Sequence, residues 1–151
     1  MHANMVTLGR HVAAENRHDM AETLATLHPD CLFRDHATGQ TWNGHAGAEA
    51  HYRQHWEAFD VTVAPRADQI SLWQDEDIYV AQAAWRGRHI GPFMGIAPTG
   101  RDIDHVFTVF VRFRDGLMHS EEFFYDLSSL MAQLGAPPIA ALDDLPFRSA
   151  A

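Results

Sequence analysis

Residues 101–126 read RDIDHVFTVFVRFRDGLMHSEEFFYD, and their pattern sets the architecture of the whole chain. Asp115-Gly116 is a strong signal for a tight hairpin turn, and strand-forming residues flank it on both sides. We therefore predict two long antiparallel strands, Arg101 to Arg114 and Leu117 to Asp126. We expect these two strands to form one wall of a small-molecule pocket.

The residues before this hairpin also follow the two-residue period of strands. Ile78 to Ile90 is predicted as a long strand, and a further strand from Val61 to Trp73 is broken near Pro65. Gly91 to Gly100 contains three glycines and two prolines, which predicts a loop. One side of the Ile78 strand carries Tyr79, Ala81, Ala83 and Trp85.

Helical periodicity dominates the first 60 residues. The apolar stripe of the first predicted helix consists of Met5, Leu8, Val12 and Ala13. The other predicted elements are a helix from Asp19 to Leu27 with Asp19 as N-cap, strands Cys31–His36 and Gln40–Trp42, a helix from Gly44 to Phe59, and a closing helix from Leu127 to Leu134. This order predicts an α+β fold, in which four long antiparallel strands curve into a cone and about three N-terminal helices cover the concave face. Such a cone favours an internal pocket.

Composition narrows the class of function. A length of 151 residues fits one domain, and the formal net charge of −9 argues against a nucleic-acid partner. All 11 basic residues are arginine, so lysine nucleophiles and Schiff-base chemistry are excluded. Cys31 is the single cysteine, and neither a signal peptide nor a membrane span is visible, so we expect a cytoplasmic protein without disulfides.

Several motifs resemble one family. Residues 87–101, GRHIGPFMGIAPTGR, are similar to the G-x-F-x-G-I-x-P-T-G-[RK] loop of SnoaL-like polyketide cyclases, also called ester cyclases. Residues 112–116, RFRDG, resemble the R-F-x-D-G hairpin of that family. Asp126-Leu127 followed by residues 133–135, QLG, resembles its W-D-L…Q-L-G ending, and Asp35-His36 resembles an early D-H pair. The resemblance spans Leu24 to Gly135.

The resemblance implies a nuclear-transport-factor-like fold, with residues 1–135 as a single SnoaL-like domain and 136–151 as a Pro/Ala-rich tail. It also implies that Asp126, near the end of the last strand, acts as general acid/base in an aldol-type cyclisation of a polyketide ester, with no metal or organic cofactor. Many members read E-H-W where this chain has Ser120-Glu121-Glu122. Glu122 replaces the aromatic residue, and by alternation it shares a strand face with Asp126.

Each candidate site residue also has a structural interpretation. Asp126 is a catalytic candidate or the N-cap of the closing helix, and Glu122 is a ligand contact or a solvated carboxylate. His36 and His105 are the histidines expected at the pocket and are counted as catalytic candidates, although most histidines serve structural roles. No metal-binding spacing is present. The aromatic and apolar residues expected to bind substrate, or simply to form the core, are Trp42, Tyr52, Trp56, Trp85, Phe93, Met94, Phe107 and Phe124.

Two functions remain open at this point. One is a cofactor-free enzyme that moves a proton on a hydrophobic substrate, giving a cyclised, isomerised or related product as a lyase or isomerase would. The other is a non-catalytic domain that binds a small molecule or mediates dimerisation. Apolar residues on the outer sheet face (Val106, Phe110 and Ile78) lead us to expect a homodimer in either case.

Overall fold

The computed structural model describes residues 3–64 and 68–137 of the chain. Four helices are present within these ranges. They are α1 (Ala3–Asn16), α2 (Met20–Ala25), α3 (Gly44–Phe59) and α4 (Leu127–Gln133). None of the described helices is long and apolar enough to cross a membrane.

The described strands form one sheet in the order β2-β1-β7-β6-β5-β3, and β4 also pairs with β5. Every pairing is antiparallel except β1 with β7, which run parallel. The strands are β1 (Leu27–Asp35), β2 (Thr41–Asn43), β3 (Thr62–Ala64), β4 (Ser71–Trp73), β5 (Ile78–Arg88), β6 (Asp102–Arg114) and β7 (Leu117–Tyr125).

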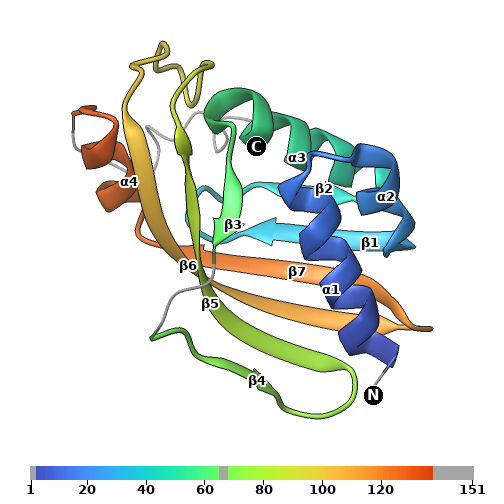
Figure 1. Cartoon of the computed structure of the whole chain (residues 1–151). Coiled ribbons are helices and arrows are strands. Elements are labelled where there is room, and N and C mark those ends of the chain that lie inside the picture. Colours follow the sequence, from blue (N-terminus) through green and yellow to red (C-terminus); the bar gives the residue numbers. More distant parts are fainter. Residues whose placement is uncertain (1–2, 65–67, 138–151) are drawn as a thin grey trace.

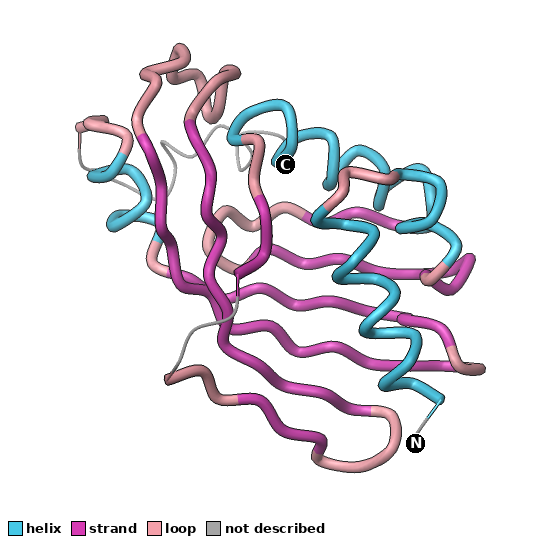
Figure 2. The backbone as a smooth tube through the Cα atoms, viewed as in Figure 1, coloured by secondary structure: helices cyan, strands magenta, loops and turns pink. Residues whose placement is uncertain are grey.

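The sheet curves strongly and stays open, and α1 and α3 lie over its concave face (Figure 1). The bend of β5 and β6 is visible along the backbone in Figure 2. The predicted α+β cone is therefore confirmed. The prediction of four long strands is wrong in detail, because β3 and β4 have three residues each and only β5, β6 and β7 form the long antiparallel part.

Two predicted elements differ at the start of the chain. The predicted apolar stripe of the first helix is correct for Leu8 and Val12, which face inward, and wrong for Met5 and Ala13, which are exposed. The buried residues of this helix are Asn4, His11 and Ala14. Strand β1 begins at Leu27, so Pro29 lies inside a strand rather than ending a helix before one. The pairing of β1 with β7 shifts register between Leu27 and Leu32, which is where a proline without an amide hydrogen is tolerated.

Asparagine side chains form hydrogen bonds at both ends of α1 to the sheet and to the turn before β5. Asn4 Nδ2 donates to the carbonyl of Glu76 at 2.8 Å, in the turn before β5. Asn16 Nδ2 donates to the Val63 carbonyl at 3.0 Å, and its Oδ1 accepts from the Val63 amide at 2.7 Å. These bonds hold α1 across the concave face and aim its middle turns inward.

Candidate active site

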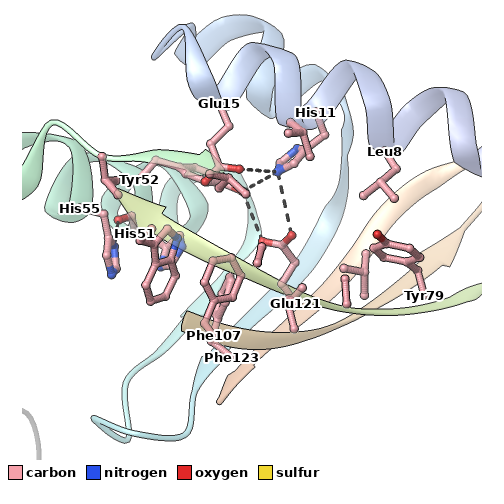
Figure 3. A pocket seen from close by; sticks show the side chains of 18 of the residues that line it. Leu8, His11, Glu15, His51, Tyr52, His55, Tyr79, Phe107, Glu121 and Phe123 are labelled. Atoms are coloured by element: carbon pink, nitrogen blue, oxygen red, sulfur yellow. Dashed lines mark hydrogen bonds and ion pairs between the residues drawn. The ribbon is translucent and has the colours of Figure 1, made fainter. Parts of the chain in front are cut away.

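The concave face of the sheet, α1 and α3 enclose a cavity of about 280 Å³ (Figure 3). Its size lies near the lower end of the ~300–1,000 Å³ that is usual for ligand pockets. Most of its wall is apolar and aromatic. Prominent wall residues are Trp56, Tyr79, Trp85, Phe107, Val111 and Phe123.

Four polar side chains meet at the α1 side of this cavity, and we call them the acid cluster: His11, Glu15, Tyr52 and Glu121. His11 Nε2 lies 3.0 Å from Tyr52 Oη, 3.9 Å from Glu15 Oε2 and 4.0 Å from Glu121 Oε1. Tyr52 Oη lies 3.4 Å from Glu121 Oε2. Three separate elements, α1, α3 and β7, thus bring two carboxyl groups, an imidazole and a phenol together.

A β-bulge in β7 turns Glu121 toward the cavity. Arg112 of β6 pairs with Ser120, but the next residue, Phe113, pairs with Met118, so His119 is an extra residue in β7. From there on, Glu121 lies opposite Val111 of β6, on the concave face. Only 7% of Glu121 remains exposed.

Burial in this apolar wall shifts the protonation of both carboxyl groups. Loss of solvation raises the pKa of Glu121 well above its ordinary value, and the nearby charge of Glu15 raises it further. Loss of solvation also raises the pKa of Glu15 from 4.5 to about 7, although 16% of its side chain stays accessible. Two acids that hold protons near neutral pH are suited to proton transfer.

The other two members of the acid cluster are uncharged near pH 7. Burial lowers the pKa of His11 from 6.5 to about 4, so its ring is neutral. Burial raises the pKa of Tyr52 well above 10, and the carboxyl groups of Glu121 and Glu15 add to the effect. Within the described residues, no group of three or more His, Cys, Asp or Glu is arranged to hold a metal ion.

Four of the predicted substrate-binding residues line the cavity. Tyr52 and Trp56 enter from α3, one turn apart, as the helical spacing predicted. Trp85 of β5 and Phe107 of β6 stack at 4.2 Å between ring centroids and form part of the opposite wall.

Three other candidates lie together on the convex face. Glu122 points away from the cavity and accepts from Arg112 at 2.6 Å, and its other oxygen lies 2.9 Å from His36 Nε2. His36 in turn stacks on Phe124 at a centroid distance of 4.1 Å. The prediction that Glu122 faces the pocket is wrong, because the bulge places Glu121 inward instead.

Asp126 and His105 are not among the residues that line the cavity. Asp126 is exposed and caps α4, with its Oδ1 accepting from the Ser129 amide at 3.1 Å, which confirms its predicted capping role. His105 is buried on the concave side of β6 between Trp85 and Tyr125. The structure does not bring these two residues into the acid cluster.

The remaining candidates contribute to packing around the cavity. Trp42 contacts the His51 ring edge-on at 4.7 Å. Phe93 packs on Phe59 at 4.7 Å and lines a small second void beyond the main cavity. Met94 packs against the core from a turn, where its φ is 50°.

Sequence reasoning missed His11, Glu15 and Glu121. His11 and Glu15 are four residues apart in a predicted helix and share a face with Leu8 and Val12, two of its predicted apolar residues, but that face was interpreted only as packing. Glu121 and Glu122 are adjacent carboxylates of one strand, and only the bulge decides which of them faces the cavity. A search for polar residues at helical spacing opposite an acidic strand position could have found all three.

The family model for SnoaL-like polyketide cyclases matches residues 5–134. No curated protein matches the chain. Several solved structures are similar, each at less than 25% identity, and they show the fold.

Three structures illustrate the likeness. A candidate SnoaL-like polyketide cyclase from Jannaschia sp. CCS1 has a TM-score of 0.77 at 24% identity over 90% of this chain and 94% of its own. A nuclear-transport-factor-like protein from Burkholderia pseudomallei has a TM-score of 0.74 at 22% identity over 90% and 100%. TerC, co-crystallised with polyporic acid, has a TM-score of 0.71 at 18% identity over 89% and 99%. The predicted nuclear-transport-factor-like fold is thereby confirmed, and the match over residues 5–134 shows that the chain belongs to the SnoaL-like polyketide cyclase family.

Proposed function

We propose that this protein is an enzyme that moves protons on a hydrophobic substrate of the polyketide kind, without a cofactor, through the carboxyl groups of Glu15 and Glu121. The observation that carries the proposal is the acid cluster: two proton-holding carboxyl groups face the same apolar cavity. The apolar walls supply binding energy for a flat or fused-ring compound. The family resemblance supports the same class of chemistry.

The chemistry needs one group that accepts a proton and one that gives a proton. A carboxylate removes hydrogen from a carbon beside a carbonyl group, while a carboxylic acid protonates the carbonyl oxygen, and an enol results. As the enol carbon attacks a second carbonyl carbon and closes a ring in an aldol reaction, the enol oxygen returns its proton to the group that protonated it, and the second carbonyl oxygen takes the proton that the base removed from carbon. Return of a proton to carbon instead gives an isomer, or exchange with solvent. In each route both carboxyl groups end in the protonation state in which they began, and in solvent exchange the base first trades the removed proton for one from water.

Solvent exchange provides the test, because it needs no knowledge of the natural substrate. We expect the protein to accelerate deuterium uptake from D₂O at the carbons beside the carbonyl of bicyclic aromatic ketones such as 2-tetralone, followed by NMR. Glu121→Gln is expected to lower this rate by about 10²–10⁴-fold, the usual contribution of a general acid or base.

Glu122→Gln is the matched control, since Glu122 is the adjacent carboxylate of β7 and points to the opposite face. It should leave the exchange rate unchanged. Equal rates for Glu121→Gln and the wild type would refute the role of Glu121. A wild-type protein that binds the ketones without exchanging their hydrogens would instead support the non-catalytic binding role.

We also propose that two copies pair through the convex face of the sheet. Val106 and Phe124 leave 39% and 42% of their surface exposed there, and Phe110 packs edge-on against Phe124 at 5.7 Å. Light scattering at micromolar concentration should give the mass of a dimer. Phe124→Asp should shift it to that of a monomer, and a monomeric wild type would contradict the pairing.

A further inference from the structure

We propose that Thr26, a residue outside the cavity, fixes the tautomer of His11 and so directs a one-way chain of hydrogen bonds that makes Glu121 the acid and Glu15 the base. The chain runs from Glu121 through Tyr52 and His11 to Thr26. The roles of acid and base rest on the proposed function, whereas the tautomer of His11 can be measured without any substrate.

The direction of the chain is set at its Thr26 end. Thr26 is fully buried at the end of α2, and its hydroxyl donates to the Thr23 carbonyl at 2.6 Å. His11 Nδ1 lies 2.7 Å from the same hydroxyl oxygen. A hydroxyl has a single hydrogen, and that hydrogen is committed to a carbonyl, which can only accept. The short contact with His11 therefore requires hydrogen on Nδ1, so Thr26 is the acceptor.

The neutral His11 ring then has its lone pair on Nε2, facing the cavity side. Burial lowers the pKa of His11 to about 4, so the ring has only the one hydrogen on Nδ1 at neutral pH. Tyr52 Oη lies 3.0 Å from Nε2 and is the group that can donate to it. The single hydroxyl hydrogen of Tyr52 is thereby committed to His11.

The last contact assigns the proton of Glu121. Tyr52 Oη and Glu121 Oε2 are 3.4 Å apart, which is longer than the Tyr52–His11 contact. With its hydrogen engaged by His11, Tyr52 has none left to donate to Glu121, so a charged Glu121 would lack that donor in a buried apolar wall. Glu121 is thus a carboxylic acid in the resting protein, and burial, which raises its pKa, acts in the same direction.

Glu15 stands beside the chain rather than in it. Its Oε2 lies 3.9 Å from His11 Nε2, beyond hydrogen-bond distance, so no member of the chain dictates a proton on Glu15. With one carboxyl group already neutral, Glu15 is the group that can ionise without placing two charges side by side. Its pKa near 7 leaves a useful fraction of carboxylate at neutral pH.

The tautomer can be tested directly by ¹⁵N NMR of protein labelled at histidine, with the His11 signals assigned by their absence in His11→Gln. At pH 7 we expect a protonated-type shift for His11 Nδ1 and an unprotonated-type shift for Nε2. Thr26→Val keeps the side-chain shape but removes the acceptor, so the pure Nδ1-protonated pattern should be lost. Thr26→Ser retains the hydroxyl and should restore it.

Solvent exchange of 2-tetralone supplies the second readout. Thr26→Val should lower the exchange rate about tenfold, and Thr26→Ser should return it to within about twofold of the wild type. Hydrogen on Nε2 in the wild type, or an unchanged His11 pattern in Thr26→Val, would overturn the inference even if exchange is catalysed. Absence of exchange with the expected tautomer would instead overturn the proposed function and leave the hydrogen-bond chain intact.

Discussion

Replacing Glu15 with glutamine is expected to leave the free energy of unfolding nearly unchanged near pH 4 and to raise it by about 3 kcal/mol at pH 8. The folded carboxyl group has a pKa of about 7 because burial disfavours its charge, whereas the unfolded one has the ordinary value of 4.5. Between these values the folded protein holds one more proton than the unfolded chain. Wild-type stability therefore falls as the pH rises through this window, and the glutamine variant escapes that loss.

Urea unfolding of both proteins at several pH values measures this difference. Glu57→Gln is the control, because the side chain of Glu57 is 72% exposed on α3 and its replacement should shift stability little at any pH. A Glu15→Gln curve parallel to that of the wild type from pH 4 to pH 8 would show that Glu15 ionises normally in the fold. The titratable neighbours that face Glu15 are His11, Tyr52 and Glu121.

Gly87→Ala is expected to destabilise the protein by about 3 kcal/mol or more, at the upper end of the usual cost of overpacking. An added Cβ at Gly87 would lie 2.2 Å from the carbonyl oxygen of Phe59 and 3.1 Å from Cα of Val61. Both are backbone atoms, so no side-chain rotation can relieve the contact. The chain that follows α3 crosses β5 here on its way to the cavity wall at Val61.

Gly9→Ala provides the contrasting change. Gly9 lies inside α1, and nothing would lie within 4 Å of its added Cβ. Alanine is more favourable than glycine inside a helix by about 1 kcal/mol, so the free energy of unfolding of this variant should rise by up to that amount. Thermal unfolding of the two variants decides the matter, and a Gly87→Ala protein as stable as the wild type would contradict the described crossing of β5.

The sequence predicted the architecture well because its local signals agree with one another. The bounds predicted for the third helix, Gly44 to Phe59, are those observed for α3, and the Asp115-Gly116 turn joins β6 to β7. Asp19 caps α2 as expected, with its side chain accepting from the Glu22 amide. Hairpin turns and caps depend on a few neighbouring residues, so these elements could be found without tertiary information.

The candidate site was harder to predict, because one extra residue changes which side chains face inward. If the pairing at the two-residue turn continued along both strands without interruption, Val109 would lie opposite Glu122, and Glu122 would face inward. In the structure Val111 lies opposite Glu121, so Glu121 faces inward instead. Only the bulge at His119 makes this difference, and no local signal in the sequence revealed it.

The site residues of helix α1 were also missed. The inward face of α1 covers a cavity rather than a packed core, so His11 and Glu15 lie beside Leu8 and Val12 on a face that an apolar pattern marks only as packing. Tyr52, Trp56, Trp85 and Phe107 were found from their spacing, because aromatic walls follow the ordinary rule that apolar residues face inward.

The protonation state of Glu121 tests the central claim of this account most directly. Protein labelled with ¹³C at glutamate carboxyl groups can be titrated by NMR, and the Glu121 signal can be assigned by its absence in Glu121→Gln. We predict that this carboxyl group keeps the shift of a protonated acid through pH 7, because it lies in an apolar wall beside Tyr52 and Glu15. A midpoint near the ordinary glutamate value of about 4.3 would show that Glu121 is a solvated carboxylate and would contradict the account.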